Sequence, residues 1–232
     1  MDNPEDRSFE ISSVLTEVLN LAESNWLMLL VVTVAAAAGY TVIELSVDDS
    51  TAFSLQNLFS FVVLYLQILV IVRLAREKGL LDGRDHEDGS PTLGGYFRAF
   101  GQSILWTLGV IFGLVLLVIP GIWLMTIWFV VLPVLLVENE NVMDSFGRSK
   151  ALVTPHFWKI LLLVLILALV YVAAAVALFL FVPYPEDYSI WTNLPLNLLL
   201  QAVQTGGWVL GLATYIQLAN LTGREDLEDV FA

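Results

Sequence analysis

Long apolar segments alternate with short polar segments along the whole chain. The core of a bilayer is about 30 Å thick and needs about 20 helical residues to cross it, so apolar runs of this length predict membrane spans. Six such runs occur, at residues 26–46, 55–75, 101–119, 121–137, 158–182 and 195–219. The pattern predicts an all-α integral membrane protein, a six-helix transmembrane bundle made of three helical hairpins.

Two segments between or before these spans have apolar residues at helical spacing on one side and charged residues on the other. They are residues 9–24, which end at Asn25, and residues 141–154. Both are predicted to be cytoplasmic amphipathic helices that lie in the membrane plane. A shorter segment at residues 96–100 precedes the third span, so one interpretation is a threefold internal repeat of in-plane helix and hairpin. The alternative is that any helix approaching a membrane has this pattern.

The connection between the third and fourth predicted spans has no polar side chain. Pro120 and Gly121 interrupt a nearly continuous apolar run, and Pro133 is expected to kink the fourth span. A helix break frees backbone groups that lipid cannot satisfy, so this turn should reach the outer interface or be buried against other helices. For residues 101–137 the alternative is a re-entrant hairpin that enters and leaves on the cytoplasmic side.

Composition supports a membrane location. Hydrophobic residues make up 58% of the 232 residues, 14% are charged, and the mean hydropathy is +0.79. A soluble domain is typically about 45–50% apolar and about 25% charged. The sequence contains no cysteine, which excludes disulfides and thiolate metal sites.

All ten Lys and Arg residues fall on one side of the predicted topology. The first, third and fifth connections between spans carry none of them. This distribution follows the positive-inside rule and places both termini in the cytoplasm of a multi-pass protein of the cell (cytoplasmic) membrane. The predicted organisation is an acidic N-terminus with an amphipathic helix (1–25), a membrane domain (26–219) with a cytoplasmic loop at 76–100, and an acidic C-terminal tail (220–232).

The polar segments are strongly acidic. Asp and Glu total 23 residues and the formal net charge is -13, which argues against nucleic acid as a partner. An acidic surface with more Arg than Lys is typical of proteins from a salt-rich cytoplasm, where ions screen the self-repulsion. An ordinary acidic membrane protein is the alternative interpretation.

Few residues in the predicted spans are equipped for chemistry. Glu44 is the only acid inside a span, and it lies near the outer end. A proton relay or an ion-coupling site would need more ionisable groups, and His86 and His156 do not have the spacing of a metal site. We therefore predict no catalytic residue, no metal site and no cofactor.

Two sets of side chains are candidates for binding. The first set shares a face of the sixth predicted span and comprises Gln201, Gln204 and Thr205. These residues predict a polar groove for a lipid headgroup or solute, or alternatively hydrogen bonds between helices. The second set lies at the cytoplasmic interface and comprises Arg148, Lys150, Lys159 and Trp158. These residues are candidates to bind anionic lipid headgroups, and the alternative is that they only set the orientation.

Small residues four apart occur within the predicted spans and permit close approach of helices. The two GxxxG pairs are Gly109/Gly113 and Gly207/Gly211. They predict packing inside the bundle, with a homodimer face as the alternative.

Residues 118–158 contain an ordered set of features. A Pro-Gly pair is followed by an apolar helix with a proline, a short acidic turn, an amphipathic helix with Ser and Arg, and an aromatic entry to the next span. These features are Pro120-Gly121, Pro133, Glu138, Ser145 to Lys150, and Phe157-Trp158. The segment resembles the membrane domain attached to some glycerophosphoryl diester phosphodiesterases, and it is similar to the YciC-type family of small integral membrane proteins.

The resemblance implies a multi-helix membrane protein without an established activity. In the fused enzymes, hydrolysis belongs to a separate soluble barrel, which has no counterpart in this sequence, so phosphodiesterase activity is not expected. We expect a non-enzymatic accessory or lipid-interacting membrane module. Its partners would be membrane lipids, another membrane protein or further copies of the chain. The alternatives are a facilitator or scramblase-like transporter for a lipid or small solute and an intramembrane enzyme.

Overall fold

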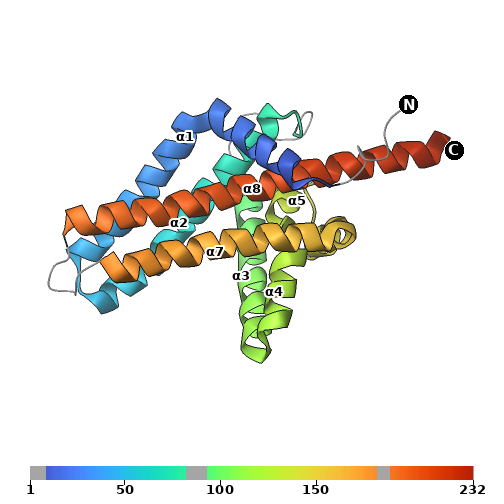
Figure 1. Cartoon of the computed structure of the whole chain (residues 1–232). Coiled ribbons are helices and arrows are strands. Elements are labelled where there is room, and N and C mark those ends of the chain that lie inside the picture. Colours follow the sequence, from blue (N-terminus) through green and yellow to red (C-terminus); the bar gives the residue numbers. More distant parts are fainter. Residues whose placement is uncertain (1–8, 82–92, 182–188, 232) are drawn as a thin grey trace.

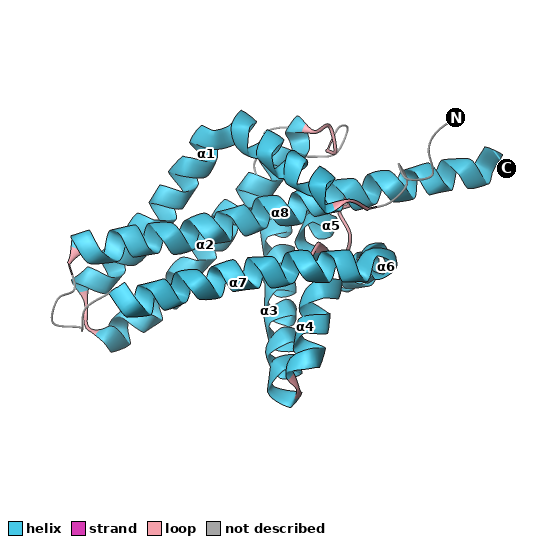
Figure 2. Cartoon of the chain, in the orientation of Figure 1, coloured by secondary structure: helices cyan, strands magenta, loops and turns pink. Residues whose placement is uncertain are grey.

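The computed structural model describes residues 9–81, 93–181 and 189–231, and throughout these ranges the chain forms helices and short turns without a strand (Figure 2). The helices, in chain order, are α1 (Ile11–Ser46), α2 (Asp49–Glu77), α3 (Leu93–Leu116), α4 (Val118–Ile127), α5 (Val131–Val137), α6 (Val142–Val153), the 3-10 helix η2 (Thr154–His156), α7 (Phe157–Phe181) and α8 (Ile190–Phe231). The all-helical prediction is confirmed for these residues.

Five helical segments of the described chain are long and apolar enough to cross a membrane. They are Ile11–Ser46, Asp49–Glu77, Leu93–Leu116, Val118–Val137 and Val142–Ala177. The chain therefore has the helices of a polytopic membrane protein. Helix α8, predicted as the sixth span, is not among the five. Six amide side chains lower its mean hydropathy, and they are Asn193, Asn197, Gln201, Gln204, Gln217 and Asn220.

The axes of helices α1, α2, α7 and α8 are roughly aligned, and these helices pack side by side (Figure 1). Helix α1 packs along both α8 and α2, and α7 packs antiparallel to α8. Helix α1 bends at Asn25, whose φ of -123° and ψ of 19° are not helical. The sequence predicts the end of the first amphipathic helix at this residue. The arm before the bend buries Val14 and Leu21 and exposes Leu15 and Leu19, so apolar side chains lie on both its inner and outer sides.

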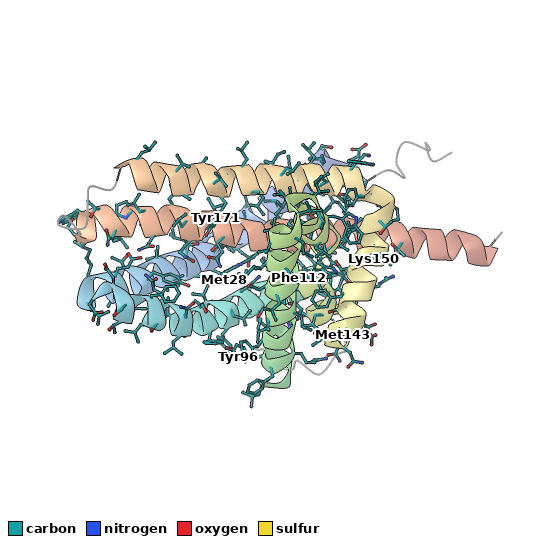
Figure 3. The ribbon with its side chains drawn as sticks, turned by 90° about the horizontal axis from the view of Figure 1, so that it is seen from below. Met28, Tyr96, Phe112, Met143, Lys150 and Tyr171 are labelled. Carbon is teal, nitrogen blue, oxygen red and sulfur yellow. The ribbon has the colours of Figure 1, made fainter. Side chains whose placement is uncertain are left out.

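Helices α3 and α4 form a hairpin that lies across the other long helices. Figure 1 and Figure 3, which view the molecule at right angles, both show α3 running across α7 and α8. The two arms approach closely because of glycine. A Cβ added at Gly113 would lie 2.9 Å from the Cα of Gly121, and one added at Gly109 would lie 2.5 Å from the Trp128 ring. This GxxxG pair therefore packs inside the chain.

The structure corrects the position of the predicted turn between α3 and α4. The turn between α3 and α4 lies at Leu117, whose φ of -162° and ψ of 139° are extended, and not at Pro120 and Gly121. The predicted fourth span is interrupted at residues 128–130, in the turn before Pro133, where the missing N–H and the ring of a proline disturb a helix. Both prolines occupy the first turn of a helix, α4 or α5. A backbone N–H has no helical partner there, so proline is tolerated.

Helix α5 is the centre of the molecule. All seven of its residues are buried, and it contacts α2, α3, α6 and α8. A helix that is apolar on every side must be covered on every side. The surrounding helices provide this cover, and the hairpin joins the rest of the molecule here.

Helix α6 has nearly the bounds predicted for the second amphipathic segment. It lies at the start of α7 and points across the direction of that helix, and Figure 3 shows it side-on with Met143 and Lys150 along it. Its inner side is formed by small and apolar residues, and the Ser149 hydroxyl donates to the carbonyl of Ile127 at 2.9 Å. Residues 96–100, predicted as a third amphipathic segment, form no separate helix. They lie within α3, which is continuous from Leu93 because no proline separates them from the following apolar run.

Candidate functional site

A cavity of about 790 Å³ lies where the α3–α4 hairpin meets the long helices. Its walls come from α2, α3, the turn before α5, α5 itself, α7 and α8, with one tyrosine from α1. Much of the wall is aromatic, including Phe61, Phe100, Trp106, Trp128, Phe129 and Trp208. This volume falls within the range of about 300–1,000 Å³ that is usual for small-molecule sites.

Three glutamines from three different helices give the cavity its polar character. Gln67 comes from α2, Gln102 from α3 and Gln204 from α8. Gln102 is only 4% exposed, and within the described chain its amide oxygen has no hydrogen-bond partner. Among the described residues that line the cavity there is no Asp, Glu, Lys, Arg or His. The site therefore offers amides and hydroxyls without a charge.

Two of the lining hydroxyls already donate their protons to the backbone. Ser60 donates to the carbonyl of Asn57 at 2.6 Å, and Ser103 donates to the carbonyl of Phe100 at 2.8 Å. Each oxygen keeps lone pairs with which it can accept a further hydrogen bond. Together with the amide oxygen of Gln102, these atoms are acceptors in a wall that also carries donors, the glutamine amide nitrogens and the indole N–H groups.

The structure does not bring the three residues of the predicted groove to one surface. Gln204 lines the cavity. Thr205 instead accepts a hydrogen bond from the Thr33 hydroxyl of α1 at 3.1 Å, which is the alternative role considered for this set. Gln201 is 7% exposed, and it is absent from the described lining of the cavity.

The four candidate lipid-binding residues divide into two pairs. Arg148 and Lys159 make internal contacts. The Nε of Arg148 lies 3.0 Å from a carboxylate oxygen of Glu138, and the Lys159 ammonium donates to the carbonyl of Phe9. Lys150 and Trp158 are exposed, with the Trp158 side chain 79% accessible. Lys159 is exposed as well, so of the four only Arg148 is partly buried.

A cluster of acidic and hydroxyl groups joins three helices at the base of α6. The Glu138 carboxylate, at the end of α5, pairs with Arg148 of α6 and accepts a hydrogen bond from the Tyr215 hydroxyl of α8 at 3.2 Å. The sequence gives no sign of the Tyr215 contact because the two residues are far apart along the chain. The pairing gives Arg148 an internal contact in a cluster that joins α5, α6 and α8.

A second polar cluster lies around Glu44. The sequence did not predict it. This carboxylate accepts hydrogen bonds from Gln56 of α2 at 3.0 Å and from Asn197 of α8 at 2.9 Å. Asn197 also donates to the Thr41 hydroxyl at 3.0 Å. Amide donors thus satisfy the only acid in the predicted spans. The spacing of Thr41 and Glu44 on one helical face was the available signal, but it does not identify the neighbouring helices.

No group of three or more potential metal ligands occurs in the part of the chain that the structure describes. In the comparisons with known proteins, no protein-family model, no curated protein and no solved structure matches this chain.

Proposed function

We propose that this chain is a non-enzymatic, lipid-interacting module of the cell membrane. In the proposed topology α1, α2, α7 and α8 cross the bilayer and both termini are cytoplasmic. The α3–α4 hairpin and α6 lie in the cytoplasmic half, along the membrane plane. This differs from six full crossings in that residues 101–127 enter and leave on the same side.

Contacts at the two ends of the long helices support the orientation. At one end, Lys78 pairs with Glu17 at 2.8 Å, and Lys159 donates to the carbonyl of Phe9. The end of α2, the first arm of α1 and the start of α7 therefore meet there, together with the basic residues. The other end holds the Glu44 cluster and, among the described residues, no Lys or Arg. The positive-inside rule assigns the basic end to the cytoplasm.

The orientation and surface of the hairpin are the observation that carries the proposal. The α3–α4 hairpin lies across the helices that would cross the bilayer (Figures 1 and 3). Its far end is strongly apolar and exposed, with Val115 79% and Ile119 80% accessible. A helix is about 10 Å wide, whereas half of a bilayer core is about 15 Å thick. The hairpin therefore fits within one leaflet, where acyl chains would cover it.

The backbone of the hairpin is also suited to lipid. Only Leu117 separates α3 from α4, and its N–H still donates to the carbonyl of Gly113 at 3.1 Å. Pro120 has no N–H and so removes one of the unsatisfied donors at the start of α4. Both features reduce the number of backbone groups that a hydrocarbon environment would leave without partners.

The resemblance of residues 118–158 to the membrane domains of some glycerophosphoryl diester phosphodiesterases agrees with a non-catalytic role. In the proposal these residues form the turn of the hairpin, the central helix α5 and the in-plane helix α6. They would anchor the protein in the cytoplasmic leaflet and hold the long helices together.

Native mass spectrometry of the protein, extracted gently from its own membrane, tests the lipid-interacting role. We expect lipid adducts that persist at collision energies which remove detergent. A protein that retains no lipid but carries a stoichiometric protein partner would contradict this role and identify an accessory subunit instead.

A lipid facilitator is the second candidate function. It is favoured by Gln67 and Gln204, which place polar groups from α2 and α8 in a cavity between otherwise apolar helices. The test is scrambling of a fluorescent phospholipid in proteoliposomes, measured by dithionite quenching. Our proposal predicts no acceleration above empty vesicles, and a clear acceleration would favour the facilitator.

A further inference from the structure

The cavity between the hairpin and the long helices has features that restrict what can bind there. We propose that it takes an uncharged amphiphile whose headgroup carries a hydroxyl group, such as a diacylglycerol or a prenyl alcohol. This inference depends on the proposed lipid-interacting role and names the class of lipid.

The described lining of the cavity is uncharged, which favours an uncharged ligand. No residue in the described lining is an acid, a lysine, an arginine or a histidine. A phosphate or an ammonium group moved into this site would lose its hydration without gaining a counter-charge, which is strongly unfavourable. Cationic side chains such as Lys78 and Lys159 lie instead at the ends of α2 and α7. An uncharged headgroup is therefore favoured over a phospholipid headgroup.

Three oxygens of the lining favour a ligand that donates a hydrogen bond. The amide oxygen of Gln102 is buried without a partner in the described chain. The hydroxyls of Ser60 and Ser103 have used their protons on backbone carbonyls. Towards a ligand these three oxygens can only accept, whereas the amide nitrogens of Gln67 and Gln204 can donate. A hydroxyl headgroup both donates and accepts, so it matches both kinds of group. A ligand with acceptors alone, such as a quinone or an ester, would leave the three oxygens unsatisfied.

The aromatic walls of the cavity favour a ligand with a large apolar part. The same walls carry indole and phenyl rings from α3, the turn before α5, and α8. Such rings cover a chain or a flat apolar body well and leave a few polar groups to fix its orientation. Tyr171 of α7, labelled in Figure 3, also belongs to this lining. One end of the ligand would meet the glutamines while its apolar part lies against the rings.

The test uses the full-length protein in detergent and native mass spectrometry with three lipids that share the same acyl chains. These are dioleoylglycerol, its 3-acetyl ester, in which the hydroxyl is blocked, and dioleoylphosphatidic acid. We expect dioleoylglycerol to bind at one site. The acetyl ester should bind about 3–10-fold more weakly, since one hydrogen bond is lost, and phosphatidic acid should bind more weakly still.

Two variants assign the binding to the cavity. Gln102→Leu removes the unpartnered amide and should weaken dioleoylglycerol binding by about the same factor. Gln201→Leu is the matched control, because Gln201 is also buried and its amide oxygen is also unpartnered in the described chain, but it does not line the cavity. Gln67→Leu serves as a second lining variant if Gln102→Leu does not fold.

Two outcomes would overturn the inference. Phosphatidic acid binding as tightly as dioleoylglycerol would refute the uncharged class while leaving the lipid-interacting role intact. Equal binding of all three lipids, unchanged in the lining variants, would show that acyl chains fill the cavity without recognition of the headgroup. Failure of the proposed function itself would instead show as a protein that retains no lipid from its native membrane.

Discussion

Asp48 shows how single side chains determine where a helix begins in this protein. Its carboxylate accepts hydrogen bonds from the Ser50 and Thr51 hydroxyls and from the Thr51 N–H, which starts α2 directly after α1. The sequence predicts a short turn here, because Asp, Ser and Thr are the usual N-terminal caps. Contacts between distant residues, such as Tyr215 with Glu138, could not be predicted because no local pattern records them.

The Asp48 cap gives a prediction about pH. Hydrogen bonds from Ser50 and Thr51 lower the pKa of Asp48 from 3.8 to about 2. A carboxyl group with a lowered folded-state pKa stabilises the fold above its ordinary pKa, and this stabilisation is lost as the pH falls from about 3.8 towards 2. Asp48→Ala should therefore lower the melting temperature at pH 7 and have little effect near pH 2. A carbon-13 titration of the Asp48 carboxyl with a midpoint near 3.8 would contradict this.

The two cations of α6 should respond differently to the same substitution. Lys150 is exposed, and a basic residue near an anionic membrane surface contributes about 1 kcal/mol, or about 5-fold in affinity. Lys150→Gln should thus reduce retention of anionic lipid about 5-fold and leave the melting temperature unchanged. Arg148→Gln should lower the melting temperature because it removes the partner of Glu138. Native mass spectrometry of anionic-lipid adducts and thermal unfolding measure the two effects. If Arg148→Gln reduced lipid retention and Lys150→Gln did not, Arg148 would be the lipid contact.

At the scale of helices, the hydrophobic pattern predicts elements better than it predicts their interruptions. Four predicted spans coincide with or lie within α1, α2, α7 and α8, since each is a long run with polar residues at its ends. The interruptions at Leu117 and at residues 128–130 lie among apolar residues, so no change of polarity marks them. The prolines follow each break by a few residues and mark the first helical turn, which explains the error in the position of the α3–α4 turn.

The contact between the arms of the hairpin should depend on Gly113. A Cβ there would approach the backbone of Gly121 to within 2.9 Å, and backbone cannot move aside easily. Gly113→Ala is expected to destabilise the protein by about 1–3 kcal/mol through overpacking. Gly101→Ala is the matched control in the same helix, because a Cβ at Gly101 meets nothing within 4 Å. Thermal unfolding in detergent compares the two, and equal effects would mean that the arms do not depend on this contact.

At the scale of the whole molecule, the charge distribution predicts which ends of the helices lie together, and the contacts of Lys78 and Lys159 agree with it. The direction of the α3–α4 hairpin could not be predicted. Periodicity and hydropathy describe a helix along its own axis, whereas the crossing angle follows from packing around α5. For the same reason the sequence located the polar residues of α8 but could not assign Gln204 to the cavity and Thr205 to α1.

The proposed topology is tested most directly by cysteine accessibility, since the chain contains no native cysteine. Single variants Ser50→Cys, Lys150→Cys and Ile119→Cys would be treated in intact cells with a membrane-impermeant maleimide. Ser50→Cys, in the outer turn, should be labelled, and Lys150→Cys should be labelled only after the cells are opened. Ile119→Cys reports the hairpin tip. If the hairpin lies in the cytoplasmic leaflet, this thiol stays unlabelled in intact cells. Labelling of Ile119→Cys from outside, at a rate like that of Ser50→Cys, would show a full crossing and contradict the proposed topology.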